Sequence, residues 1–127
     1  ISGDTAPCSS VAAAADGCDV LVHEATFADD SVDRAEAKAH TTARQAARIA
    51  ADAGVGLLAL THLSSRYSGW EHRNEAREEF ERTWVARDFD SVVVPVPERG
   101  EPELVRWKDR KLQPQTESAA GETGIVA

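Results

Sequence analysis

Four side chains that can hold a metal ion or move a proton lie next to apolar segments of this sequence. His23 and Glu24 end the apolar run in CDVLVHEATF, His62 ends the run in VGLLALTH, and Asp4 lies in the opening ISGDT. Apolar strands in soluble proteins usually end in turn residues such as Gly, Asn or Pro. Imidazole and carboxylate groups are the usual ligands of a catalytic zinc ion where thiolates are absent. These positions are therefore candidates for a metal site.

Another histidine, His40, stands directly before a predicted helix, in the run His40-Thr41-Thr42. The amino terminus of a helix presents free N–H groups and the positive end of the helix dipole, so it favours an anion such as phosphate. A histidine there could also donate a proton to a departing oxygen. The residues alone indicate a metal-assisted phosphoryl site with an acid–base histidine. The alternative, a set of scattered structural residues, stays open.

The segments that must position these side chains alternate between helix and strand. Apolar runs predict strands, and apolar stripes with a capping Thr or a closing Gly predict helices. The predicted helices cover residues 7–16, 41–53 and 70–83, the predicted strands cover 18–25, 55–62 and 90–96, and residues 31–39 form a short polar helix or a loop. This order predicts an α/β fold, in which ligands gather beyond the carboxyl ends of the strands. We therefore expect Asp4, His23, Glu24 and His62 on one rim.

The composition is that of one ordinary domain with an acidic surface. The chain has 127 residues, of which 22 are acidic and 14 are Lys or Arg, so its net charge is −8. This balance argues against broad electrostatic binding of nucleic acid, which needs a basic face. It permits a small basic site, or a host with a salty cytoplasm. No apolar run is long enough to span a membrane, and Cys8 and Cys18 form no CxxC pair, so we expect reduced thiols in a cytoplasmic protein.

Both ends of the sequence are unusual for a whole protein. The chain contains no Met, and ISGDT is typical of the last residue of a strand and the turn after it. We therefore expect a fragment or a split subunit. From about residue 108 the composition turns to Gln, Pro, Ser, Gly and Glu, which predicts that residues 108–127 form a disordered acidic tail after a folded part of residues 1–107.

Five short motifs, taken in order, resemble the carboxyl-terminal half of ribonuclease Z, the tRNA 3′-processing endonuclease of the metallo-β-lactamase superfamily. They are SGDTAPC, HEATF, AHTTARQAA, LTHLSSRY and ARDF, and the resemblance covers roughly residues 1 to 96. The GDT turn and a histidine after a strand are common to the whole superfamily. HEATF followed by an H-[ST]-T sequence is far more specific to the ribonuclease Z branch.

The resemblance implies a fold and an activity. Residues 1–107 would form half of a metallo-β-lactamase αββα four-layer sandwich. The complete enzyme would be a homodimer that holds two zinc ions and removes the 3′ trailer from precursor tRNA, by hydroxide attack on a phosphodiester that leaves a tRNA 3′-hydroxyl.

The resemblance also implies a role for individual residues. Asp4 would bridge the two zinc ions, and His62 would be a ligand of the second. His40 would donate a proton to the leaving 3′ oxygen, and Glu24 would orient and polarise that imidazole.

Two further residues would contact substrate phosphates, namely Thr42 at the helix amino terminus and Arg66 in the SSRY sequence. The signature HxHxDH, which supplies most of the metal ligands in the family, is absent from this chain. We therefore expect the chain to need an amino-terminal half as its partner, to be inactive alone, and to expose one apolar face of its sheet without that half.

Five other residues receive structural interpretations. His23 precedes Glu24 on a strand, so its side chain should point to the opposite face and pack in the interior. His72 lies in a polar helix and is expected to face solvent. Cys8 is expected to be a small buried residue, although a thiolate would be stabilised at a helix start. Arg87 and Asp88 precede the last strand and would help to hold the rim.

Two alternatives to the ribonuclease hypothesis remain. One is another metallo-β-lactamase hydrolase that acts on a phosphodiester or an ester. The other is a non-catalytic remnant that acts as a partner subunit.

Overall fold

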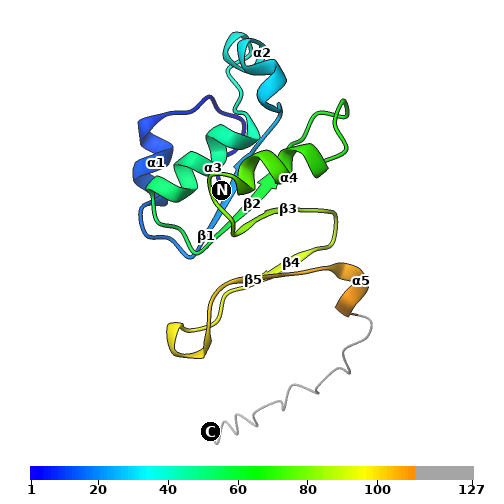
Figure 1. Cartoon of the computed structure of the whole chain (residues 1–127). Coiled ribbons are helices and arrows are strands. Elements are labelled where there is room, and N and C mark those ends of the chain that lie inside the picture. The colour runs from blue at the N-terminus through cyan, green and yellow to red at the C-terminus, as the bar shows by residue number, and fades with distance from the viewer. Residues whose placement is uncertain (111–127) are drawn as a thin grey trace, which may run out of the picture.

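A computed structural model describes residues 1–110 of the chain. Its first sheet is parallel and consists of β1 (Val20–Glu24), β2 (Leu57–Thr61) and β3 (Thr83–Val85), in the spatial order β1-β2-β3 (Figure 1). The second sheet is an antiparallel pair, β4 (Ser91–Val93) and β5 (Glu103–Val105). The fold is thus mixed α/β, as predicted.

Helices connect the parallel strands. The α-helices are α1 (Ser9–Ala15), α2 (Val32–Ala37), α3 (Ala43–Asp52), α4 (Trp70–Arg77) and α5 (Trp107–Arg110), and the short 3-10 helices are η1 (Asp29–Ser31) and η2 (Pro97–Arg99). The predicted tail lies outside the described residues from residue 111 on, and its first residues, 108–110, belong to α5.

Most of the predicted elements are confirmed, with shorter bounds. The helix predicted over residues 70–83 is wrong in its last part, because α4 ends at Arg77 and Thr83 already belongs to β3. Strands β3 and β5 were not predicted, since three residues are too few to show an alternating pattern.

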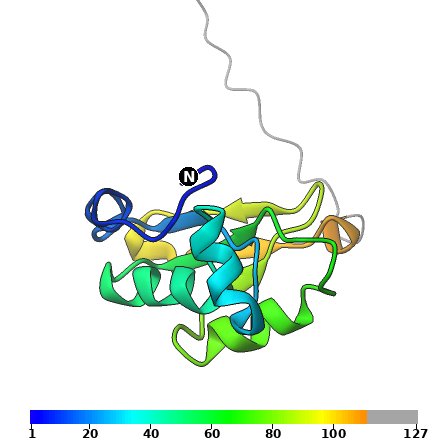
Figure 2. The ribbon, with the colours of Figure 1, turned by 90° about the horizontal axis from the view of Figure 1, so that it is seen from above.

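The core lies on both faces of β2. Leu58 and Leu60 pack against the alanine-rich face of α3, while Leu57 and Ala59 face Leu104 of β5. Successive residues of a strand point to opposite faces, so this alternation places α1, α3 and α4 on one side of the parallel sheet and the β4–β5 pair on the other (Figure 2).

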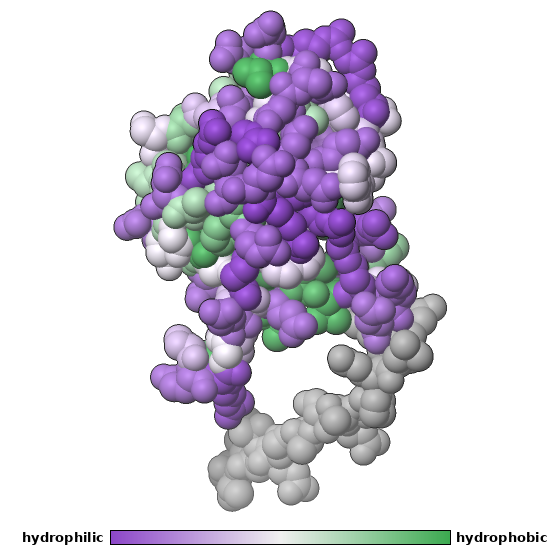
Figure 3. All heavy atoms as spheres, viewed as in Figure 1, coloured by the Kyte–Doolittle hydropathy of each residue, from purple (hydrophilic) through white to green (hydrophobic). Residues whose placement is uncertain are grey.

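The expected bare sheet face is only partly correct. The β4–β5 pair covers Leu57 and Ala59 on that face of the parallel sheet. The exposed apolar surface therefore lies on the β4–β5 pair and not on the parallel sheet. Large apolar side chains that are highly exposed lie in and around β4 and at α5: Phe89, Val93, Val94, Val96 and Trp107. Figure 3 shows a hydrophobic area in the lower middle of the molecule.

Helix α2 ends in a Schellman motif that places His40. The N–H of Ala39 donates to the carbonyl of Glu36, the N–H of His40 donates to the carbonyl of Ala35 at 2.9 Å, and Ala39 has a φ of 55°. This φ is in the left-handed region, which penalises a residue with a Cβ atom. The local strain is therefore stored one residue before His40.

Replacing Ala39 with Gly is expected to raise the free energy of unfolding by about 1 kcal/mol, because Gly adopts this φ without a steric penalty. Chemical denaturation monitored by circular dichroism would measure the change. Ala13→Gly, an exposed site inside α1, is the matched control and should lower stability by about 1 kcal/mol. A loss of stability in both variants would contradict the Schellman assignment.

Candidate functional site

Three groups that can ligate a metal meet beyond the carboxyl ends of β1 and β2. Asp4, His40 and His62 each offer one ligand atom, and these atoms all lie within 4.8 Å of one another. They come from different segments, because Asp4 follows an extended segment that hydrogen-bonds to β1 through the N–H of Ser2. His40 precedes α3, and His62 follows β2. The predicted rim thus brings Asp4, Glu24, His40 and His62 together.

Glu24 is the buried carboxylate behind this group, with only 2% of its surface exposed. Its Oε1 atom accepts hydrogen bonds from the N–H of Thr5 (3.1 Å), the N–H of Thr41 (3.2 Å) and Nδ1 of His40 (2.8 Å). Its Oε2 atom accepts from the N–H and the hydroxyl of Thr26, both at 2.9 Å. Five donors therefore hold one carboxylate in a fixed orientation.

The same contacts set the protonation of Glu24. Burial alone raises the pKa of the carboxyl, but the hydrogen bonds from Thr26, His40 and Thr5 outweigh it and lower the pKa below its ordinary value. Glu24 is thus ionised at neutral pH, and its negative charge faces the imidazole of His40.

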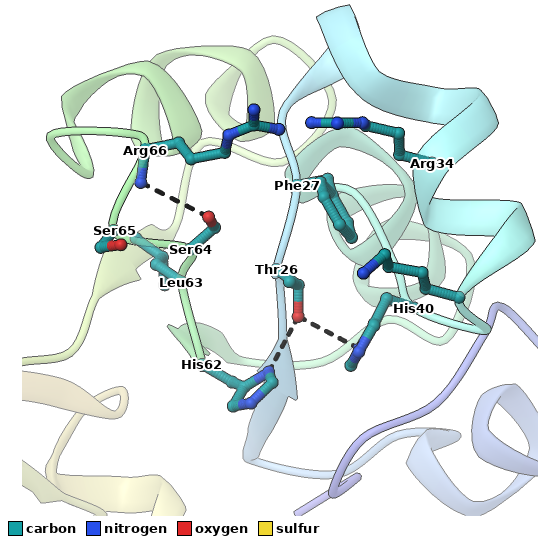
Figure 4. Close-up of a pocket in the computed structure, with 10 residues that line it drawn as sticks. Thr26, Phe27, Arg34, His40, His62, Leu63, Ser64, Ser65 and Arg66 are labelled. Carbon is teal, nitrogen blue, oxygen red and sulfur yellow. Dashed lines mark hydrogen bonds between the residues drawn. The ribbon is translucent and has the colours of Figure 1, made fainter.

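Thr26 links the two histidines and fixes their tautomers. Its Oγ1 atom lies 2.9 Å from Oε2 of Glu24, 3.2 Å from Nδ1 of His40 and 2.8 Å from Nδ1 of His62 (Figure 4). A hydroxyl has one proton to give, and the carboxylate is the strongest acceptor of the three. Thr26 therefore donates to Glu24 and accepts from the Nδ1–H of His62, while the Nδ1–H of His40 makes its shorter contact with Glu24. The Nε2 atom of each ring remains available to a metal ion or a substrate.

The two imidazoles stack with their centroids 5.4 Å apart. His62 has a φ of 53°, a left-handed conformation that is uncommon for a residue other than Gly. Such strain persists only where the surroundings impose it, and it is frequent at functional sites. Here it turns the ring of His62 at the end of β2 toward Thr26.

A cavity of about 550 Å³ opens beside these residues. Its lining includes His40, His62 and Thr26 together with Arg66, which was predicted to contact phosphate. Two further cations line it that were not predicted from the sequence, namely Arg34 of α2 and Lys38, the C-cap residue of that helix.

Thr42, the other predicted phosphate contact, does not line this cavity. It is fully buried. Its hydroxyl accepts from the N–H of Gln45 (3.2 Å), and the side chain of Gln45 accepts from the N–H of Thr42 (2.9 Å), which together form a capping box at α3. The structure gives Thr42 a capping role, and its phosphate contact stays a prediction.

The structural predictions for two histidines had different outcomes. His23 is packed in the interior, as predicted, with Nδ1 2.7 Å from the carbonyl of Glu24 and a pKa lowered by burial. The prediction that His72 faces solvent is wrong, because His72 is fully buried and makes an edge contact with Tyr67, with ring centroids 4.9 Å apart. Its burial likewise lowers its pKa.

Cys8 and the ARDF sequence also differ from expectation. Cys8 is exposed, so its interpretation as a small buried residue is wrong, and hydrogen bonding to Ser10 lowers the pKa of its thiol. Asp90 rather than Asp88 holds the ARDF turn in place, because its carboxylate accepts from the N–H of Arg87 (3.0 Å) and from Arg106.

The donor set fits a metal ion of intermediate softness such as zinc. Asp4 and His62 are about half exposed or more, which leaves them open to an ion, and the Nδ1–H of His62 is held by Thr26 as a metal-ligating histidine usually requires. The group of Asp4, His40 and His62 leaves coordination positions for ligands from another segment or from water.

No family model matches the sequence. Ribonuclease Z of Exiguobacterium sibiricum is 52% identical over 96 residues, which are 74% of this chain and 32% of that protein. Ribonuclease Z of Gemmatimonas aurantiaca is 47% identical over 100 residues (77% and 32%), and that of Haloarcula marismortui is 52% identical over 82 residues (63% and 26%). The chain is homologous to ribonuclease Z. It spans between a quarter and a third of the length of these curated relatives, 26% to 32%.

Solved structures agree on the fold. The metallo-β-lactamase fold protein YhfI of Bacillus subtilis superposes with a TM-score of 0.59 at 30% identity, over 64% of this chain and 33% of that chain. Human tRNase Z, short form, superposes with a TM-score of 0.58 at 28% identity, over 74% of this chain and 32% of that chain. The parallel sheet and its helices therefore match part of a metallo-β-lactamase fold. None of the helices among residues 1–110 has the length and apolar content to cross a membrane.

Proposed function

We propose that this chain supplies part of the active site of a zinc-dependent endoribonuclease that removes the 3′ trailer from precursor tRNA. The remaining metal ligands come from a polypeptide segment with an HxHxDH sequence, and the complete enzyme is a homodimer. The homology to ribonuclease Z supports the choice of substrate.

One observation carries the proposal, namely the hydrogen bond of 2.8 Å between Nδ1 of His40 and Oε1 of Glu24, next to the candidate metal ligands Asp4 and His62. A buried carboxylate behind an imidazole fixes its tautomer and stabilises its charged form.

In this proposal, His40 carries both of the protons that matter for the leaving group. His40 donates Nδ1–H to Glu24, so its other nitrogen, Nε2, is the atom that can deliver a proton to the leaving 3′ oxygen as the P–O3′ bond breaks. Glu24 offsets the positive charge of the protonated ring before that transfer. Arg66, on the wall of the cavity, binds a phosphate oxygen through its guanidinium.

Asp4 and His62 would hold zinc at the open side of the site. Bound zinc supplies a hydroxide at neutral pH and stabilises the charge that develops on the phosphate oxygens.

The test is cleavage of a 3′-extended precursor tRNA by the complete gene product that contains residues 1–127, loaded with zinc and assayed at high salt. The proposal expects cleavage at the start of the trailer with a 3′-hydroxyl on the tRNA. A folded, metal-loaded protein that leaves the RNA intact and hydrolyses a small phosphodiester or ester would contradict the proposal in favour of a different metallo-β-lactamase hydrolase.

The gene itself distinguishes the remaining alternative. A reading frame that continues upstream of Ile1 and encodes an HxHxDH sequence supports the enzyme. A start codon directly before Ile1, with no such partner gene, supports a non-catalytic remnant.

A further inference from the structure

The cavity beside His40 and His62 is strongly basic. Of its ten lining residues, three are Lys or Arg and none is acidic: Arg34, Lys38 and Arg66. Figure 4 shows the side chains of Arg34 and Arg66 reaching toward one another from opposite sides, above the level of Thr26, His40 and His62. The chain as a whole carries a net charge of −8, so this concentration of positive charge is local.

These cations are not neutralised by neighbours. Within the part of the chain that the structure describes, no carboxylate lies within ion-pair distance of Arg34 or Lys38. Asp30 interacts electrostatically with Arg66, but its carboxylate accepts the hydrogen bond of Tyr67. By contrast, Arg44 alone pairs with three acids, namely Asp29, Glu78 and Glu79.

Two of these cations come from α2 and its carboxyl end. Arg34 lies inside α2, Lys38 is the C-cap residue of that helix, and both line the same cavity. Arg66 adds a third cation across the cavity. Because like charges in a confined space repel one another, an anion bound between them would be stabilised by all three.

We propose that Arg34 and Lys38, together with Arg66, bind a second phosphate of the substrate strand, adjacent to the phosphodiester that faces His40 and His62. This inference rests on the proposed ribonuclease function and narrows it. The site takes an oligonucleotide with at least two phosphates in a row, and a simple diester leaves these cations unused. The guanidinium of Arg34 suits such a contact because its planar fork can bind two oxygens of one phosphate.

Equilibrium binding tests the contact without any cleavage. The complete protein should bind pApA, a dinucleotide with two phosphates, roughly tenfold more tightly than ApA, which has one, since a hydrogen bond to a charged group contributes about a factor of ten. Arg34→Ala should reduce this preference, while Lys38 and Arg66 retain part of it, and should leave the affinity for ApA unchanged. Arg48→Ala is the matched control, because Arg48 is exposed on α3, pairs with Glu79 and does not line the cavity. An undiminished preference for pApA in Arg34→Ala would overturn the proposal.

Cleavage kinetics separate this inference from the ribonuclease proposal. Arg34→Ala should lower kcat/KM on precursor tRNA about tenfold and reduce the slope of log Kd against log salt by about 0.7 to 1. Hydrolysis of bis(p-nitrophenyl) phosphate should stay at the wild-type rate, which also shows that the variant is folded. Wild-type cleavage of tRNA with an unaffected Arg34→Ala variant would refute the second phosphate contact alone. An inability of the wild type to cleave RNA, with the pApA preference intact, would refute the ribonuclease function and retain the contact.

Discussion

Replacing His40 with alanine is expected to slow the cleavage of precursor tRNA by about 10²- to 10⁴-fold, the usual contribution of a general acid, while zinc stays bound. The reason lies in the hydrogen bonds of the ring. Nδ1 of His40 is held by Glu24 at 2.8 Å and by Thr26 at 3.2 Å, which leaves Nε2 as the atom that meets the substrate. Without the imidazole, the leaving 3′ oxygen must depart without a proton donor.

Metal content and cleavage, measured on the same sample, decide the role of His40. His62→Ala is the control, because His62 is half exposed, stands beside Asp4 and is expected to lose both zinc and activity. The alternative role of His40 is that of a metal ligand, because the ligand atoms of Asp4, His40 and His62 all lie within 4.8 Å of one another. If His40→Ala loses zinc to the same extent as His62→Ala, then His40 is a ligand and the acid role is refuted.

The sequence predicts well which candidate side chains lie close together, because these residues follow secondary-structure boundaries. Glu24 and His62 end two apolar strands that pair in parallel, so their carboxyl ends meet at one edge. The closing Gly54 and the Thr42 cap likewise define α3 from local signals, which act over a few residues only.

The surroundings of Glu24 could not be predicted in the same way. The N–H groups of Thr5 and Thr41 reach Glu24 from 19 residues before it and 17 residues after it. No periodicity records such contacts, because they depend on how α3 and the amino-terminal segment pack on the sheet. The position of Thr26 within HEATF was the one sequence feature that pointed to this residue. Its contacts with both histidines follow only from the fold.

The wrong prediction for His72 has a similar cause. Charged neighbours on both sides make residues 70–77 resemble a solvated helix, yet one face of α4 packs on α3 and buries Ala76 and His72. The buried face of this two-turn helix contains only two residues, so the polar composition of the segment did not predict it. The basic lining of the cavity could not be predicted either. Arg34 and Lys38 are isolated cations in a short polar segment, and only the fold brings them to the same cavity as Arg66.

Replacing Glu24 with Gln is expected to lower the free energy of unfolding by about 3–5 kcal/mol, because at least two buried donors would lose their acceptor, at about 1–3 kcal/mol each. Glutamine keeps the size of the side chain but replaces one acceptor oxygen with an NH₂ group. That group would face donors only, either those of Thr26 or those of Thr5, Thr41 and His40. Glu36→Gln, an exposed site on α2, is the matched control and should change stability by less than about 0.5 kcal/mol.

The pH dependence of the stability loss in Glu24→Gln shows whether Glu24 stabilises the fold through its negative charge or through packing alone. The pKa of Glu24 is lowered in the folded protein, so its stabilisation is fully present above the ordinary value of 4.5 and disappears as the pH falls through the lower folded pKa. The stability gap between wild type and Glu24→Gln should therefore be widest near neutral pH and shrink on acidification below about pH 4.5. Denaturation curves at pH 7, 5 and about 3.5 would measure it. A gap that stays constant over this range would mean that Glu24 acts through packing alone, and the electrostatic support proposed for His40 would then have no basis.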